Sequence, residues 1–323
     1  MWNLTVNEAA RWLLEHDKFL IVTHRRPDGD TVGASALLCR ALRALGKEAH
    51  ILENPQLTRT YDQYHRGLTC PAPFEGATVV TVDVAGREML CLGAQELEID
   101  FFVDHHGSNK GLAPQGLLRP EAAACGEPVW KVVEALGVSL DKPMAEALYV
   151  AVSTVTGCFR YANTTAQTLR TAAACLEAGA DVYPINQALF ESVRLARLRL
   201  NAYMAQNLEL LCDGRVALCP IPLAVERELD IREEDMENVS SFARNVEGVL
   251  LAATFRTVEN GDTKLSLRSS PDYDVARVAV ALGGGGHKSA AGATIHGSQT
   301  LAREKLLAVL TVQGILRPRW PLS

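Results

Sequence analysis

The segment FLIVTHRRPDGD, at residues 19–30, constrains the fold more than any other part of the chain. Its first half, Phe19–Thr23, is a short apolar run rich in β-branched residues, which predicts a strand buried on both faces. His24, Asp28 and Asp30 follow at once, on a loop bent by a proline and a glycine. Because ligands bind at the carboxyl ends of strands in open α/β sheets, we interpret this loop as half of a metal site.

Composition sets three limits on the chain. Its 323 residues are 48% hydrophobic without a long apolar run, which predicts a globular protein and argues against a membrane protein. The charged N-terminal stretch lacks the features of a signal peptide, and the eight cysteines include no CxxC pair. We therefore expect a cytoplasmic protein with reduced thiols. With a net charge of −6, an anionic substrate must be held locally, by metal ions and a few basic groups.

Two further predicted strands end on polar side chains. Residues 77–82 lead into Asp83, and residues 99–103 lead into Asp104, His105 and His106. Another strand is expected over residues 47–52, and helices over residues 31–45, 126–136, 143–153 and 165–178. Strands that alternate with helices predict an α/β domain with a mostly parallel sheet flanked by helices.

A second, smaller α/β domain is predicted after residue 212. Strands are expected over residues 216–219, 248–257, 263–269 and 290–295, and helices over residues 274–282 and 301–310. Between the domains, apolar positions keep helical spacing from Ile185 to Leu211. This pattern predicts one long connecting helix, so that the domains span residues 1–185 and 213–323 with a connector at residues 186–212.

Each candidate site residue also has an ordinary structural interpretation. Asp83 alone is typical of a turn, Asp30 could be the N-cap of the following helix, and a pair of histidines is more often structural than ligating. The spacing HxxxDxD together with a strand-final DHH nevertheless favours a metal cluster. Carboxylates with imidazoles suit Mn²⁺, Mg²⁺ or Fe²⁺, and two such ions sharing a carboxylate can activate water and neutralise phosphate oxygens.

The C-terminal half contains candidates for phosphate binding. The glycines that precede His287 are either a flexible loop or a backbone nest that lets a phosphate approach closely. Arg268, at the end of an alternating strand, is either a surface ion-pair partner or a bidentate clamp for a terminal phosphate. Its candidate partners in phosphate binding are Ser269, Arg256, Gly284, Gly285, Gly286 and His287.

In combination, the motifs resemble the DHH/DHHA1 phosphoesterases. The resemblance lies with the subfamily of oligoribonucleases and 3′,5′-bisphosphate nucleotidases, called nanoRNases or pAp phosphatases, which are related to RecJ-type exonucleases. It covers nearly the whole chain and is carried by THRRPDGD, VDVA, the DHH at residues 104–106, TGCFRYANT and GGGGHKSAAG.

The resemblance implies a site for two Mn²⁺ ions, with Mg²⁺ as an alternative. One ion would be held by His24, Asp28 and Asp83 and the second by Asp30, Asp83 and His105, with Asp83 as the bridge. The resemblance also implies that His106 faces the scissile phosphate and that Asp104 orients a ligating histidine. The residues expected to take part in catalysis are His106, Asp83 and Asp30.

One position departs from the family pattern. Where the family has an aspartate ligand in a TDTG turn, this chain has Val155 between Thr154 and Thr156. An isopropyl group cannot bind a metal ion. We therefore expect the affinity for the second ion, or the activity that depends on it, to fall by at least about 10–100-fold unless a threonine hydroxyl or a water substitutes. Three explanations of Val155 compete: a diverged enzyme with altered chemistry, a binding protein without turnover, and a deliberately inactivated chain.

The resemblance implies hydrolysis of short oligoribonucleotides such as pApA, or of pAp to AMP, by a water that two ions activate. The metal ions would lie in the first domain, and the second domain would recognise the substrate. The alternatives are a nucleotide-binding regulator with little turnover and a hydrolase like inorganic pyrophosphatase, against which the GGGGH segment argues. We expect the chain to bind neither a membrane nor long duplex nucleic acid. A homodimer of two copies is a candidate assembly.

Overall fold

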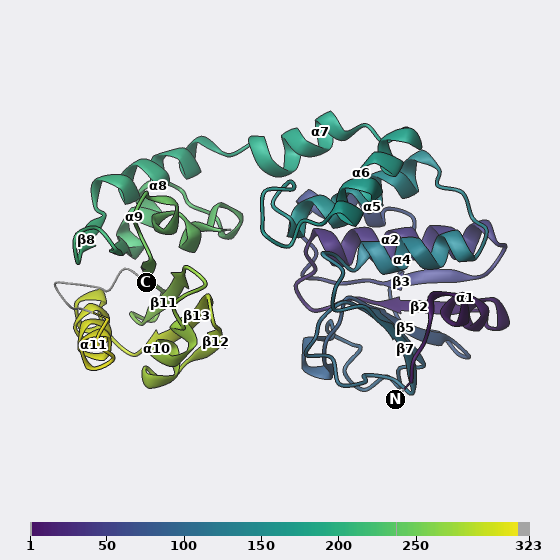
Figure 1. The fold of residues 1–323 in the computed structure, drawn as a ribbon, viewed down its shortest axis with the longest axis horizontal. Helices are drawn as coiled ribbons and strands as arrows, with labels where there is room; N and C mark the ends of the chain where they lie inside the picture. Colours follow the sequence, from purple (N-terminus) through teal and green to yellow (C-terminus); the bar gives the residue numbers. More distant parts are fainter. Residues whose placement is uncertain (1, 237, 316–323) are drawn as a thin grey trace. The chain divides into compact units, whose positions relative to one another are not determined.

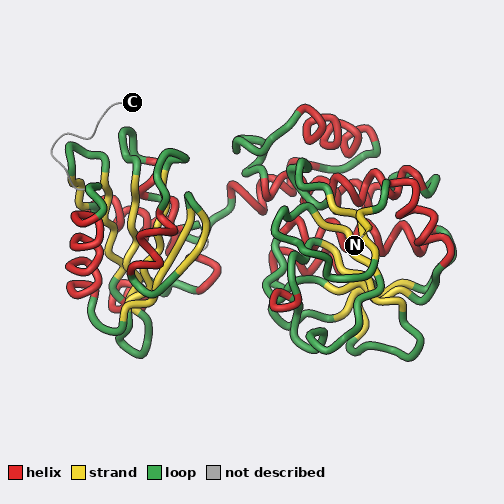
Figure 2. Tube along the Cα trace, turned by 60° about the horizontal axis from the view of Figure 1, so that its bottom comes forward, coloured by secondary structure: helices red, strands yellow, loops and turns green. Residues whose placement is uncertain are grey.

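The computed structural model describes residues 2–236 and 238–315, which form two compact units (Figures 1 and 2). Unit 1 ends at Ser192 and unit 2 begins at Val193. The predicted α/β class is confirmed for both units. Residues 316–323 of the predicted second domain lie outside the described residues.

Unit 1 is built on a seven-stranded sheet in which every neighbouring pair is parallel. The strand order is β1-β7-β6-β5-β2-β3-β4. The strands are β1 (Trp2–Asn3), β2 (Phe19–Val22), β3 (Ala49–Leu52), β4 (Thr69–Cys70), β5 (Thr78–Val82), β6 (Phe101–Asp104) and β7 (Gln115–Leu118). The order puts β2, β5 and β6 side by side in the middle of the sheet, with their carboxyl ends at one edge.

Both faces of this sheet are covered, as the apolar strand β2 predicts. Phe19 and Ile21 pack into a core with the helices, whereas Leu20 and Val22 pack against loop residues on the other face. The helical segments of unit 1 are α1 (Val6–Glu15), α2 (Gly29–Ala44), α3 (Arg59–His65), η1 (Arg87–Met89), α4 (Gly126–Ala135), α5 (Lys142–Val155), α6 (Ala166–Glu177), α7 (Val182–Asn186) and the π-helical turn η2 (Gln187–Glu191).

Helix α2 is buried along almost its whole length because it lies between the sheet and α5. Figure 1 shows α2, α4, α5 and α6 on the same side of the sheet. The close packing of α2 on α5 needs a glycine, since a Cβ added to Gly33 would lie 2.2 Å from the carbonyl oxygen of Ala147. Helix α2, which begins soon after β2 ends, is therefore packed into the core of unit 1.

Unit 2 contains a six-stranded mixed sheet with the order β12-β13-β11-β10-β9-β8. One face packs on α10 and α11, and the other packs on α8 and the short helices. The strands are β8 (Glu209–Leu211), β9 (Val216–Ile221), β10 (Leu251–Thr257), β11 (Thr263–Ser269), β12 (Gly285–His287) and β13 (Ala290–Ile295). The helical segments are α8 (Leu195–Gln206), α9 (Leu223–Glu228), η3 (Glu233–Met236), η4 (Val239–Ser241), η5 (Ala243–Asn245), α10 (Val275–Ala281) and α11 (Gln299–Val312).

The single helix predicted over residues 185–211 is wrong. The chain forms α7, then η2, leaves the helical conformation at residues 192–194 and continues as α8 and β8. The reason is that the apolar positions serve two cores: Ile185 packs into unit 1, whereas Leu200 and Met204 pack into unit 2. Val193, between them, is 54% exposed and has no core to hold it in a helix.

No helix within residues 2–236 and 238–315 is both long and apolar enough to span a bilayer.

A buried histidine gives unit 1 a pH-dependent stability. His65 ends α3, and its Nε2 lies 3.0 Å from the Ser35 hydroxyl. Burial lowers the pKa of His65 from 6.5 to about 4, because a charged ring cannot be solvated there. The neutral ring is therefore favoured in the folded state, and protonation favours unfolding.

We expect this contribution to be fully present above pH 6.5 and to be lost as the pH falls from 6.5 towards 4. Relative to a His65→Gln variant, the free energy of unfolding should fall by about 3 kcal/mol across that window. Urea denaturation of both proteins at several pH values measures the difference. A difference that does not change with pH would contradict this assignment.

Candidate metal centre

Three adjacent strand ends assemble the candidate centre in unit 1. The register pairs β2 with β5 and β5 with β6, so the residues after these strands emerge at one edge. Asp83 follows β5 directly and has a left-handed backbone with φ of 62°, an uncommon conformation outside glycine that places it among the other groups. The structure thus brings together the side chains of the sequence-predicted ligands, which come from residues 24–30, 83 and 104–106.

One half of the centre contains His24, Asp28 and Asp83. His24 Nε2 lies 3.9 Å from Asp28 Oδ1 and 3.9 Å from Asp83 Oδ2. Asp28 is the N-cap of α2, and its Oδ1 accepts hydrogen bonds from the amides of Asp30 and Thr31. The N-cap expected as an alternative at Asp30 is thus supplied by Asp28 instead.

The other half contains His105, Asp30 and Asp83. His105 Nε2 lies 3.6 Å from Asp30 Oδ2 and 3.4 Å from Asp83 Oδ1. The other ring nitrogen, Nδ1, lies 3.0 Å from the carbonyl oxygen of Ala122, an acceptor that leaves Nε2 as the unprotonated nitrogen of a neutral ring. Asp30 is fully buried, and its two oxygens accept hydrogen bonds from the amides of Cys125 and Gly126 at the start of α4.

Asp104 holds His106 in place. Its Oδ1 lies 2.8 Å from His106 Nδ1 and accepts hydrogen bonds from the amides of His105 and His106. Its Oδ2 accepts a hydrogen bond from Asn109 Nδ2 at 2.7 Å. Since Nδ1 is engaged by Asp104, Nε2 is the nitrogen of His106 that is left for other chemistry.

The electrostatics of the centre favour a bound cation. Burial raises the pKa of Asp30 well above its ordinary value, and the Asp83 carboxylate raises it further. Although burial disfavours a charged His105 ring, Asp83 and Asp30 raise the pKa of His105 to about 10. Without a cation, protonation of Asp30 and His105 is therefore favoured, because it reduces the negative charge gathered at the centre.

The distances also fit metal ligation. The imidazole and carboxylate atoms of the two halves stand 3.4–3.9 Å apart, longer than ordinary hydrogen bonds. Two ligand atoms about 2.1 Å from one ion are separated by roughly 3–4 Å. In addition, Asp83 Oδ1 is buried and accepts no hydrogen bond from the described residues. Two groups of residues meet the spacing required of ligands, namely Asp83 with His105 and His106, and Asp83 with His24 and Asp28.

Comparison with known proteins agrees with this geometry. Residues 18–152 match the DHH family, N-terminal domain, and residues 221–311 match the DHHA1 domain. The bifunctional oligoribonuclease and PAP phosphatase NrnA of Thermus thermophilus is 32% identical over 281 residues, which cover 86% of this chain and 84% of that protein. The chain belongs to the DHH/DHHA1 phosphoesterases.

Solved structures support the fold of this DHH/DHHA1 phosphoesterase. An exopolyphosphatase-related protein from Bacteroides fragilis matches with a TM-score of 0.83 and 22% identity, and the match covers 96% of both chains. RecJ of Thermus thermophilus in complex with Mn²⁺ matches with a TM-score of 0.55 and 17% identity, over 97% of this chain and 55% of RecJ. A His/Asp cluster such as the one described above is typical of the DHH family.

The six-stranded sheet of unit 2, called the DHHA1 sheet below, places Arg268 and His287 in one row. Both residues pair with Ala290 of β13, so their side chains share a face of the sheet. Arg268 is half-buried, its Nη1 donates to the carbonyl of Leu267, and it forms no ion pair with a described acidic residue. Burial lowers the pKa of Arg268. A half-buried guanidinium without a described carboxylate partner is a plain candidate for binding an anion.

Other predicted phosphate contacts have structural roles in this sheet. Ser269 is buried, and its hydroxyl donates to the carbonyl of Tyr273. A Cβ on Gly284 would lie 2.1 Å from the carbonyl oxygen of Gly292, and a Cβ on Gly286 would lie 2.5 Å from an atom of β13. These two glycines are therefore required by strand packing, whereas a Cβ on Gly285 would meet open space. The contribution of these four residues to phosphate binding stays a prediction.

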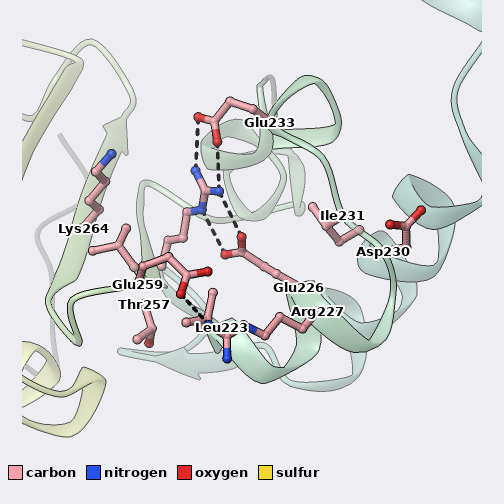
Figure 3. A pocket seen from close by; sticks show the side chains of 11 residues that line it. Leu223, Glu226, Arg227, Asp230, Ile231, Glu233, Thr257, Glu259 and Lys264 are labelled. Atoms are coloured by element: carbon pink, nitrogen blue, oxygen red, sulfur yellow. Dashed lines mark hydrogen bonds and ion pairs between the residues drawn. The ribbon is translucent and has the colours of Figure 1, made fainter.

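Arg256 is separated from Arg268 along the sheet. Arg268 pairs with Ala252, four residues before Arg256 on β10, which corresponds to about 13 Å. The Arg256 guanidinium forms paired hydrogen bonds with both Glu226 and Glu233 (Figure 3). These carboxylates raise its pKa, and the three side chains line a pocket of about 490 Å³. Arg256 is thus already neutralised by two acidic residues.

The segment around Val155 lies beside the metal-binding loop. Val155 is the last residue of α5 and packs against the core of unit 1, so the predicted turn at residues 154–157 begins inside a helix. A Cβ added to Gly29 would lie 2.4 Å from the Thr154 side chain, which shows how closely α5 meets this loop. The hydroxyls of Thr154 and Thr156 donate to carbonyl oxygens within α5.

Two polar side chains at the centre, Thr31 and Asn109, are not singled out by any motif in the sequence. The Thr31 hydroxyl donates to Asp83 Oδ2, and Asn109 Nδ2 donates to both Asp104 and the carbonyl of Val84. Each joins segments whose approach depends on the folded sheet. Their nearness to acidic motif residues is the only indication that the sequence offers.

We expect Mn²⁺ to stabilise unit 1, because an ion that binds only the folded state adds about 2.7 kcal/mol at a free concentration of one hundred times its dissociation constant. An Asp83→Asn variant should lose most of the Mn²⁺-induced rise in unfolding temperature, since both halves of the centre lose a charged ligand. Thermal unfolding with and without Mn²⁺ measures the rise. The control is Asp62→Asn on α3, where the carboxylate is 66% exposed. Equal rises in wild type and Asp83→Asn would contradict the ligand assignment.

Proposed function

We propose that this chain is a Mn²⁺-dependent phosphoesterase that hydrolyses short oligoribonucleotides to nucleoside monophosphates, and pAp to AMP and phosphate. The observation that carries the proposal is that Asp83 belongs to two groups with the spacing of metal ligands, one with His24 and Asp28 and the other with His105 and His106. The substrate class is supported by the 32% identical relative, whose name describes an oligoribonuclease and PAP phosphatase. Mg²⁺ is the alternative ion, and pairing of two copies stays a prediction.

The residues of unit 1 would divide the work between binding metal ions and moving a proton. His24, Asp28 and Asp83 would hold one divalent ion, and Asp30, Asp83 and His105 would hold a second. Bound there, such ions supply an activated water and neutralise phosphate oxygens. Water adds to phosphorus, the bond from phosphorus to the ester oxygen breaks, and that oxygen takes up a proton.

His106 is the candidate for contact with the scissile phosphate and for delivery of that proton. Asp104 fixes Nδ1, and this hydrogen bond raises the pKa of His106. A ring held in this way presents Nε2 in a constant direction, and at neutral pH it more readily carries the second proton. Its side chain is 37% exposed, so a substrate can reach it.

Arg268 and His287 are the candidates for holding a phosphate away from the scissile bond. The guanidinium of Arg268 has a geometry that suits two phosphate oxygens at once. His287 is exposed in the same row of the sheet, and Gly285, two residues before it, leaves room for a ligand to approach the backbone. If these residues hold a second phosphate, short nucleotides with two phosphates should be preferred over single phosphate esters.

Val155 supports a second candidate function, a nucleotide-binding protein with little turnover. Its apolar side chain packs against the core and offers no oxygen to an ion. The hydroxyl protons of the neighbouring threonines are committed to helix carbonyls. Both candidate functions require nucleotide binding, and they differ in whether the bound nucleotide is hydrolysed.

We expect wild-type protein with Mn²⁺ to release AMP from pApA and from pAp, and to act slowly on long RNA. A Val155→Asp variant should increase turnover by about 10-fold or more, because an anionic ligand strengthens the second ion. Single-turnover hydrolysis of the three substrates measures both effects. The matched control is Val155→Asn, whose side chain has the same size as that of Val155→Asp but offers a neutral and therefore weaker ligand.

Tight nucleotide binding without hydrolysis in wild type, and hydrolysis in Val155→Asp, would favour the binding protein over the enzyme. Neither binding nor hydrolysis of pApA or pAp in any variant would overturn the proposed substrate class.

The two arginines of the DHHA1 sheet should respond differently to substitution. Arg268→Ala should raise KM for pAp by about 10-fold or more with little loss of stability, because an anion contact is lost. Arg256→Ala should mainly lower the free energy of unfolding, by about 1–3 kcal/mol, since it leaves Glu226 buried without a partner. Steady-state kinetics and urea denaturation of both variants separate the two effects. A KM effect confined to Arg256→Ala would contradict this assignment.

A further inference from the structure

The two oxygens of the Asp83 carboxylate have different surroundings. Oδ2 accepts a hydrogen bond of 2.6 Å from the Thr31 hydroxyl and lies 3.9 Å from His24 Nε2. Oδ1 lies 3.4 Å from His105 Nε2 and 3.5 Å from His106 Nδ1, and it is the oxygen that accepts no hydrogen bond from the described residues. The carboxylate is therefore oriented by a donor on one oxygen only.

Thr31 is held rigidly by the start of α2. It lies in the first helical turn, it is completely buried, and its backbone amide donates to the N-cap residue Asp28. A threonine in a helix has only two main rotamers, and in the one adopted here the buried hydroxyl donates to Asp83. The amide of Asp83 in turn donates to the carbonyl of Val103 on β6. Both partners of the Thr31–Asp83 hydrogen bond are thus anchored independently.

A carboxylate without such a donor can rotate, because the terminal torsion of aspartate is soft and broad. After rotation it can bind a single ion through both oxygens, as aspartate does at many metal sites. The Thr31 hydroxyl opposes this rotation. It keeps Oδ2 on the side of His24, and leaves Oδ1 to the side of His105 and His106.

We propose that Thr31 is a positioning residue that keeps Asp83 Oδ2 toward His24 and Oδ1 toward His105, the orientation in which Asp83 would offer one oxygen to each of two ions. This inference rests on the proposed function, which places two ions at the centre. It adds a residue outside the ligand set, and it assigns the individual oxygens of Asp83. The bond also couples the first turn of α2, which carries Asp28 and Asp30, to the end of β5.

The test uses Thr31→Val, which removes the hydroxyl and keeps the branched shape, and Thr31→Ser, which keeps the hydroxyl. Each full-length protein is titrated with Mn²⁺ and followed by calorimetry and by electron paramagnetic resonance, which distinguishes a spin-coupled pair of ions from separate ions. Ser35→Ala is the matched control, since it removes a buried hydroxyl from the same helix that faces His65 instead of the centre.

We expect wild type, Thr31→Ser and Ser35→Ala to bind two ions with a coupled signal. Thr31→Val should bind the second ion at least about tenfold more weakly and lose the coupled signal, as is typical when a residue that orients a ligand is removed. If Thr31→Val does not fold, Thr31→Ala, which cannot overpack the site, is expected to give the same result.

Unchanged affinity for both ions and an unchanged coupled signal in the folded variant would overturn the role of Thr31. If Thr31→Ser behaves like Thr31→Val, the role of the hydroxyl is also overturned. A wild-type protein that binds one ion or none would instead contradict the two-ion centre of the proposed function. The comparison with wild type therefore separates the two failures.

Discussion

Repulsion between carboxylates is the constraint on which the centre depends. Asp28, Asp30 and Asp83 converge at one edge of a parallel sheet, where their negative charges oppose one another. Each of them accepts hydrogen bonds on the side turned toward the protein: Asp28 from the start of α2, Asp30 from the start of α4, and Asp83 from Thr31. Helix N-termini favour anions, so the fold itself offsets part of the repulsion. The histidines then complete the side on which a cation fits.

The sequence is sufficient to predict which strand ends carry the candidate ligands, and it misses the contacts that orient them. His24, Asp83 and His105 each follow an apolar strand, and parallel strands necessarily end at the same edge. That argument needs only the order of residues. The contact of Thr31 with Asp83 joins residues 52 positions apart, and it depends on the depth at which α2 packs. No local pattern contains that information.

The failure of the predicted connecting helix has a related origin. Hydrophobic spacing shows that a segment packs on something, but it does not show whether all of the segment packs on the same core. Ile185 and Leu200 belong to different units, so a continuous pattern becomes two helices with an interruption. Arg256 shows the same limit for charges, because its acidic partners come from α9 and η3 and not from its own strand.

The tight seam between α2 and α5 has a consequence for how this protein can change over evolutionary time. Gly33 leaves no space for a larger side chain, and it lies only one turn beyond the residues that would grip the ions. A substitution deep in the hydrophobic interior that shifts α2 by a fraction of an ångström would alter ion chemistry without touching a ligand. Close packing in the interior of unit 1 would therefore constrain the proposed metal centre as well as the fold.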